Sequence, residues 1–223
     1  MSSYGITPLN KVIRGSKRAT YDAAQVHAIL DSKFLCHIAY TWEGKAIVIP
    51  TAYGRDEDKI YIHGSLKNRM MLGLLAAGEA CLSVTHLDGL VLARSAFHHS
   101  ANYRSVNIFG KVKKIEGRDK KIHALKCILN HMVPGHWEHV RQPNEKELNA
   151  TLVLELQIDT ASAKIRAEGA VDEKEDYDLP LWAGVIPVTE QMGEPVRDAL
   201  LAGTVETPPS VVNYVNGHLK NKK

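Results

Sequence analysis

Short apolar, β-prone runs separated by polar turn residues recur along this chain, which is the pattern of β-strands joined by turns. The runs Phe34–Tyr40 and Ala46–Tyr53 flank a turn at residues 42–45 and predict a hairpin. The runs Cys81–His86 and Leu90–Ala93 enclose an Asp-Gly pair at residues 88–89 and predict another. Further strands are predicted at Lys59–His63, Tyr103–Ile115, Thr151–Ala167 and Trp182–Val188.

Apolar residues three to four positions apart predict helices at Thr20–Ser32, at Lys67–Ala77 and at residues 117–131, and a helical tail from Glu194 onward. Thr20 and Ser65 are expected to cap the first two. No strand–helix–strand rhythm recurs, which argues against a doubly wound sheet. The order predicts a mainly β fold of the α+β class, an antiparallel, closed or partly closed β-barrel flanked by helices.

Bulk composition is that of an ordinary soluble domain. The chain has 223 residues, of which 44% are hydrophobic and 24% charged, enough for one domain with extensions. A formal net charge of +3 argues against nucleic acid as a partner. No apolar run approaches the ~18 residues of a membrane span, so no membrane partner is expected. The N-terminus lacks signal-peptide regions, and three widely spaced cysteines fit reduced thiols in the cytoplasm.

The start of the helix at Lys67–Ala77 gathers groups that suit an anion. Ser65, Lys67, Asn68 and Arg69 place a hydroxyl, two cations and an amide where backbone N–H groups are free and the helix dipole is positive. Gly64 is expected to leave the backbone open to a ligand. An ordinary capped helix with solvated charges explains the same residues. Cations in a first turn oppose the dipole, however, so an anion there would relieve the conflict.

Other nucleotide and catalytic motifs are absent from the sequence. It has no G-x-G-x-x-G after a strand, no phosphate-binding P-loop and no G-x-S-x-G elbow, which argues against a Rossmann cofactor, ATP chemistry and a nucleophilic serine.

Histidines are numerous but do not form a known metal motif. His98 and His99 are adjacent in a polar loop, where they are candidates for haem, metal or anion contacts. Another group contains His123, Cys127, His131, His136 and His139. A proline and a glycine at 134–135 divide this group, and no Cys-x-x-Cys or H-E-x-x-H accompanies it. Scattered surface histidines therefore explain it better than zinc, and no metal site is expected.

Several short blocks occur together in a characteristic order. They cover residues 49–53, 60–65, 98–99, 102–106 with Gly110, 132–135, 164–166 and 181–185. Each is short, but the ordered set resembles the pyridoxamine 5′-phosphate oxidase-like family of flavin-nucleotide-binding proteins. The similarity is greatest to the subgroup that includes the nitroimidazole-resistance proteins.

The resemblance implies an FMN-binding split β-barrel that works as a homodimer with FMN at the subunit interface. The flavin ring and ribityl chain would follow a wall made by Pro50, Thr51, Ala52, Tyr53, His63, Gly64 and Ser65. Ser65, Lys67 and Asn68 would hold the phosphate. From the second subunit would come Tyr103, Arg104 and Ser105, and Trp182 would close over the ring.

Three segments are expected, of which the resemblance covers only the middle one, and the resemblance also implies an activity. Residues 1–18 would be an N-terminal arm, residues 19–190 the FMN-binding barrel, and residues 191–223 an extension that packs on the barrel and has a frayed basic end. The expected function is an FMN-dependent oxidoreductase acting on a small substrate, aromatic or nitro-aromatic, with His63 as the candidate catalytic side chain.

One departure from the family argues against oxidation of pyridoxamine phosphate. The oxidases carry an Arg-rich C-terminal segment, whereas the region after Trp182 offers only Arg197. The alternative is a non-catalytic flavin- or haem-binding protein. The adjacent histidines His98 and His99 are the reason for retaining haem as a ligand.

Overall fold

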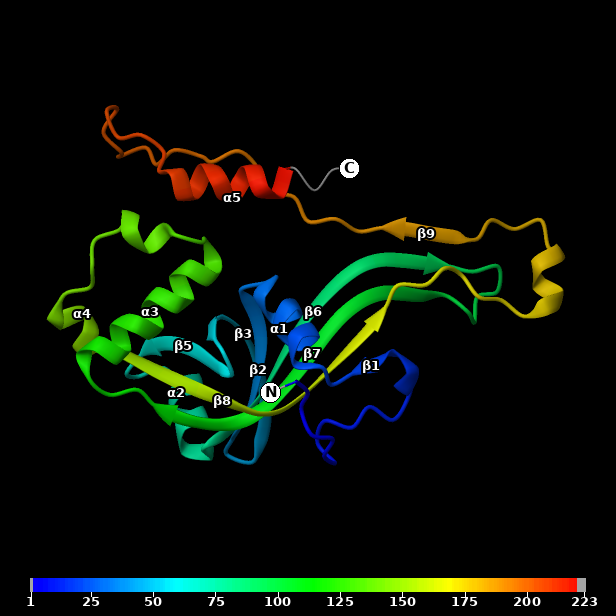
Figure 1. The fold of residues 1–223 in the computed structure, drawn as a ribbon, viewed down its shortest axis with the longest axis horizontal. Coiled ribbons are helices and arrows are strands. Elements are labelled where there is room, and N and C mark those ends of the chain that lie inside the picture. The colour runs from blue at the N-terminus through cyan, green and yellow to red at the C-terminus, as the bar shows by residue number, and fades with distance from the viewer. Residues whose placement is uncertain (1, 220–223) are drawn as a thin grey trace.

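The computed structural model describes residues 2–219, which form one antiparallel sheet curved into a barrel and flanked by helices (Figure 1). Its strands follow the order β3-β2-β6-β7-β8-β5-β4, while β1 pairs with β8 and β9 with β6. The strands are β1 (Ala19–Thr20), β2 (Leu35–Trp42), β3 (Lys45–Ala52), β4 (Gly54–Asp56), β5 (Lys59–Ser65), β6 (Glu79–Leu92), β7 (Ser100–Lys114), β8 (Thr151–Arg166) and β9 (Gly184–Pro187). The predicted mainly β, antiparallel fold is confirmed.

Five α-helices are present in the described part of the chain. They are α1 (Ala23–Asp31), α2 (Arg69–Ala77), α3 (Arg118–Met132), α4 (Glu145–Ala150) and α5 (Pro209–Leu219), with short 3-10 turns at Ser16–Arg18, His136–His139 and Lys174–Asp178. Among residues 2–219, no helix is both long and apolar enough to cross a membrane.

The barrel core is built from the inward-facing residues of the alternating strands. Ile38, Ile62, Leu82, Ile108 and Leu154, each from a different strand, are all fully buried. Helix α2 packs against β2, β5, β6, β7 and β8. Close contact is possible because Gly73 has no side chain, and a Cβ there would lie 2.7 Å from the Tyr40 ring. This packing fixes the start of α2 beside the end of β5.

The predicted hairpin at residues 88–89 is wrong, because β6 runs through it as one strand. The register with β7 shifts between Leu87 and Gly89, which marks a β-bulge rather than a turn. Pairing with β7 continues on both sides of the bulge, and β9 adds to the outer half of β6. Long-range pairing with two neighbouring strands therefore overrides the local turn signal.

Two predicted helix caps are replaced by nearby residues. Asp22, not Thr20, caps α1 by accepting a hydrogen bond from the Gln25 N–H at 2.9 Å. Asn68, not Ser65, caps α2, and its side-chain oxygen accepts the Met71 N–H at 3.3 Å. The predicted end of α2 is confirmed, because Gly78 adopts the left-handed conformation, with φ of 70°.

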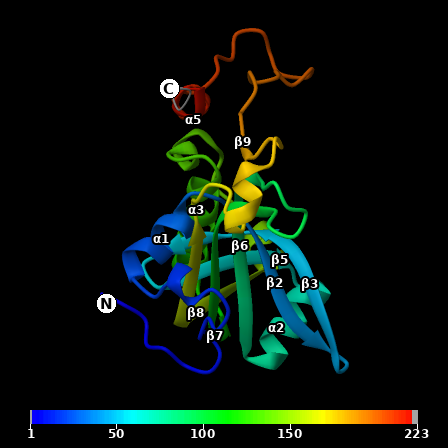
Figure 2. The same ribbon diagram turned by 90° about the vertical axis from the view of Figure 1, so that its right-hand side faces the viewer.

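The N-terminal segment lies against the barrel. Tyr4 is buried and its hydroxyl donates to Asp58 at 2.6 Å, while the Asn10 amide donates to the Ala161 carbonyl at 2.9 Å. The C-terminal extension lies on the side of the barrel opposite α2 in both Figure 1 and Figure 2. It is not helical from Glu194 as predicted, because α5 begins only at Pro209. The predicted frayed residues 220–223 lie outside the described residues.

Candidate functional site

The turn between β5 and α2 forms a compact loop that presents polar groups to solvent. The Ser65 hydroxyl oxygen accepts the Lys67 N–H at 3.3 Å, and the Ser65 carbonyl accepts the Asn68 N–H at 2.9 Å. These bonds fix the turn while leaving the Ser65 hydroxyl proton available. Because α2 starts at Arg69, the predicted cluster lies just before the helix and in its first turn.

Positive charge gathers at this turn. Lys67 and Arg69 are exposed, and neither makes an ion pair with any residue in the range 2–219. Within the same range, the backbone N–H groups of Arg69 and Met70 have no hydrogen-bond acceptor. Two cations and two free N–H donors therefore meet at the positive end of a helix, and this combination favours an anion such as a phosphate.

Two expected members of the site are occupied by structural contacts. A Cβ at Gly64 would lie 3.0 Å from the Met71 side chain and 3.2 Å from the Asn68 amide nitrogen, so the protein itself fills the space predicted to be open. The Tyr53 side chain is fully buried, and its hydroxyl donates to the Leu30 carbonyl at 2.5 Å. Only backbone atoms of Tyr53 are left for a ligand.

Strand β3 offers a partly open wall. Pro50 pairs with His37, and Thr51 with the buried Cys36. Since side chains alternate along a strand, Pro50 and Ala52 face away from the core while Thr51 points toward it.

His63 on β5 is exposed in the single chain. The surrounding protein nevertheless desolvates its ring and lowers its pKa below the ordinary value, so the imidazole stays neutral at pH 7.

The three predicted residues on β7 do not share one face. Tyr103 and Ser105 pair with Leu87 and Thr85, whereas Arg104 pairs with the buried His86. Alternation thus turns Arg104 away from its two neighbours. Arg104 forms a bidentate ion pair with Asp88, in which Nε and Nη2 donate to the two carboxylate oxygens at 2.9 and 2.8 Å. These hydrogen bonds lower the pKa of Asp88.

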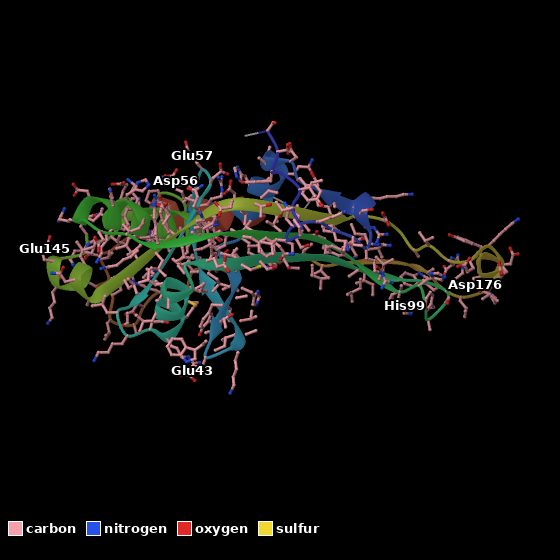
Figure 3. The ribbon with its side chains drawn as sticks, turned by 90° about the horizontal axis from the view of Figure 1, so that it is seen from below. Glu43, Asp56, Glu57, His99, Glu145 and Asp176 are labelled. Carbon is pink, nitrogen blue, oxygen red and sulfur yellow. The ribbon has the colours of Figure 1, made fainter. Side chains whose placement is uncertain are left out.

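Trp182 and the histidine pair lie at the other end of the molecule. Trp182 is 66% exposed and stacks over Gly184 at the start of β9, which pairs with the outer half of β6. His99 lies at the tip of the β6–β7 hairpin, far from α2 along the ribbon (Figure 3). Its Nδ1 accepts the Ala93 N–H at 2.9 Å, so the neutral ring carries its proton on Nε2.

A cavity of about 970 Å³ lies between the barrel and the C-terminal extension. The sequence did not predict it, although two of its lining residues, Arg104 and His131, were named as candidates for other sites. Charged groups that line the cavity form ion pairs. Arg104 pairs with Asp88, and Lys33 Nζ lies 2.7 Å from Glu190 Oε1. His86 also lines it, and burial, followed by the nearby Arg104 and Lys33, lowers the pKa of this histidine. The sequence signal that could have pointed to this cavity is His86, a histidine at an inward-facing position of an alternating strand.

Three comparisons with known proteins bear on this site. The family model described as pyridoxamine 5′-phosphate oxidase matches residues 22–165. Among curated proteins, none matches the chain. The solved flavocytochrome Anf3 from Azotobacter vinelandii is 36% identical, with a TM-score of 0.88 over 93% of this chain and 97% of that chain.

Two further solved structures are similar. The FAD and heme binding protein from Mycobacterium smegmatis is 34% identical, with a TM-score of 0.84 over 88% of this chain and 97% of that chain. A putative 5-nitroimidazole antibiotic resistance protein from Bacteroides thetaiotaomicron shares the fold, at 22% identity and a TM-score of 0.57 over 66% and 86% of the two chains. The match over residues 22–165 and the two full-length similarities show that this chain belongs to the pyridoxamine 5′-phosphate oxidase-like family.

Proposed function

We propose that this chain binds a flavin nucleotide and uses it for redox chemistry on a small molecule. The observation that carries the proposal is the turn before α2, where Lys67 and Arg69 lack ion-pair partners among residues 2–219. The free N–H donors of the same turn match the oxygens of a nucleotide phosphate. The family match supports a flavin as the nucleotide that carries this phosphate.

The flavin is FMN or FAD, which differ by the second phosphate and the adenosine. FMN is the cofactor that the sequence resemblance implies. The name of one relative, the FAD and heme binding protein, favours FAD, whereas that of the other, a flavocytochrome, specifies no particular flavin. Both nucleotides place a phosphate on the ribityl chain, so the role proposed for Ser65, Lys67 and Asn68 is the same.

A bound flavin supplies the electron-accepting and electron-donating chemistry, and the protein supplies binding and orientation. Pro50 and Ala52 would pack against the flavin from β3. His63 would offer a hydrogen bond from a neutral ring, because its lowered pKa keeps it uncharged at pH 7. A bulky aromatic such as Trp182 would exclude water from the ring system.

The distribution of these residues supports a homodimer. The phosphate turn lies beside the start of β8, where Ser65 pairs with Thr151, whereas Trp182 precedes β9, which pairs with the far end of β6 (Figure 1). A complete site therefore needs Tyr103, Ser105 and Trp182 from a second copy. A sizing measurement on flavin-loaded protein should give about twice the 24.7 kDa of one chain, and a mass near one chain would overturn this arrangement.

The test of the main proposal is spectroscopic. Purified protein, or stripped protein titrated separately with FMN and with FAD, should show flavin absorption, and chromatography of the released cofactor identifies which one is bound. A chain that binds neither nucleotide does not have the proposed function. Oxidation of a reduced nicotinamide coupled to reduction of a nitro-aromatic acceptor would separate an enzyme from a binding protein.

A second candidate function is haem binding in the cavity beneath the C-terminal extension. The cavity volume of about 970 Å³ suits a large planar ligand, and its lining includes His86 and His131. A lowered pKa keeps His86 neutral, which is the form that binds iron. Haem titration should give a Soret band that His86→Ala or His131→Ala weakens. If only the variant lacking both His98 and His99 loses the band, the haem site is at the hairpin tip instead.

A further inference from the structure

Three potential metal ligands converge at the surface between β4 and α3. His123 Nε2 lies 2.9 Å from Asp56 Oδ2 and 3.5 Å from Cys127 Sγ. One ligand atom from each of the three residues lies within 4.8 Å of the other two. The single nitrogen of His123 thus faces a carboxylate and a thiol at the same time.

Packing of α3 on the barrel creates this arrangement. His123 and Cys127 are one turn apart on α3, so they share a helical face. Strand β4 approaches that face because Gly54 has no side chain, and a Cβ there would lie 2.5 Å from the Cys127 carbonyl carbon. Asp56 follows two residues later on β4 and is labelled in Figure 3.

The histidine ring is further oriented by its neighbour on β5. Tyr61 meets the His123 ring edge to face, with 5.9 Å between ring centroids and an interplanar angle of 87°. A histidine held by both an aromatic neighbour and a carboxylate loses less rotamer freedom when it binds a ligand. The three groups are therefore partly preorganised.

We propose that Asp56, His123 and Cys127 form a Zn²⁺ site with an open fourth position. Mixed cysteine, histidine and carboxylate ligands at tetrahedral geometry are characteristic of zinc. Zinc bonds of about 2.0–2.3 Å place tetrahedral ligand atoms about 3.3–3.8 Å apart. Here His123 Nε2 lies 2.9 Å from Asp56 and 3.5 Å from Cys127, so small side-chain shifts would suffice. The ion would take the place of the hydrogen bonds around His123 Nε2, and the thiol would release its proton on binding.

Nearby cations do not oppose the site strongly, because each is already neutralised. His123 and Cys127 line a cavity of about 340 Å³ together with the cations of Arg55 and Lys126. Arg55 donates from Nε to Asp31 at 2.6 Å, and Lys126 contacts Glu138 at 2.7 Å. The cavity provides room for a water molecule as the fourth ligand.

The test is a titration of chelator-treated full-length protein with Zn²⁺, followed by calorimetry. Binding of about one ion per chain is expected, and Cys127→Ser and His123→Ala should each weaken it at least about tenfold, since even outer-shell changes cost 10–100-fold. Co²⁺ in place of Zn²⁺ should give a thiolate charge-transfer band that Cys127→Ser abolishes. Zn²⁺ should also raise the melting temperature of the native protein but not that of Asp56→Asn.

Matched controls come from the same residue types elsewhere in the chain. Cys81→Ser and His139→Ala remove a cysteine and an exposed histidine outside the cluster, and both should bind Zn²⁺ like the native protein. The proposal is overturned if the native protein binds no Zn²⁺ stoichiometrically. It is equally overturned if Cys127→Ser and Asp56→Asn, melting as cooperatively as the native protein, retain full affinity.

Discussion

Replacement of Lys67 and Arg69 by alanine should move flavin affinity and protein stability in opposite directions. Both side chains are exposed in the first turn region of α2, and neither has an ion-pair partner among residues 2–219. A charge-assisted contact with a phosphate is worth about 1.5–3 kcal/mol. Solvent exposure favours the lower end, which is about tenfold in affinity for each cation.

The double variant should therefore bind FMN or FAD about a hundredfold more weakly, measured by quenching of flavin fluorescence in stripped protein. Without flavin, both cations oppose the helix dipole, and each costs about 0.3–1 kcal/mol. Urea unfolding of the cofactor-free double variant should consequently show equal or greater stability than the native chain. Higher salt should weaken flavin binding to the native protein more than to the variant.

Lys120→Ala is the matched control. Lys120 is also exposed, also lies in the first turn of a helix, and makes no ion pair among the described residues. Its removal should leave flavin affinity unchanged. The reasoning is refuted if the double variant at 67 and 69 keeps native affinity while folding normally, or if Lys120→Ala weakens binding as much.

Three further predictions concern the barrel. Tyr53→Phe removes the bond from the hydroxyl to Leu30 and should cost about 1–2 kcal/mol in urea unfolding without weakening flavin binding. Gly54→Ala places a Cβ 2.5 Å from the Cys127 backbone and should destabilise by about 3 kcal/mol or prevent folding. Burial raises the pKa of Tyr61 to about 12, whereas the unfolded residue ionises near pH 10, so native stability should fall between pH 10 and 12. Tyr61→Phe should make the free energy of unfolding less dependent on pH in this range. An unchanged pH dependence in the variant would contradict the prediction.

The sequence predicted those features that depend on local pattern. Strands β3 and β5 follow from short apolar, β-prone runs bounded by turn residues, and the end of α2 follows from Gly78. Asp22 and Asn68 replaced the predicted caps because several polar residues are adjacent at each helix start. Which of them caps depends on where the chain leaves the preceding strand, and packing of the helix on the barrel decides this.

Features made by distant segments were not predictable in the same way. The Asp-Gly pair at 88–89 favours a turn locally, but pairing of β6 with β7 and β9 converts it to a bulge. Asp56 and Cys127 are far apart in sequence, so only the contact of β4 with α3 shows that they share a cluster. The large cavity likewise depends on where residues 188–217 return to the barrel.

The long hairpin of β6 and β7 gives the proposed homodimer a physical basis. Beyond the bulge, β6 and β9 leave the barrel and expose large apolar side chains, including Leu90 at 42% and Ile186 at 46%. Phe97 at the hairpin tip is 88% exposed. Leu90 and Ile186 are directly paired across the two strands, and neighbouring exposed apolar side chains favour burial against a partner. A second copy covering this hairpin would remove it from water and bring Trp182 toward the other chain's phosphate turn, so that one interface would complete both binding sites.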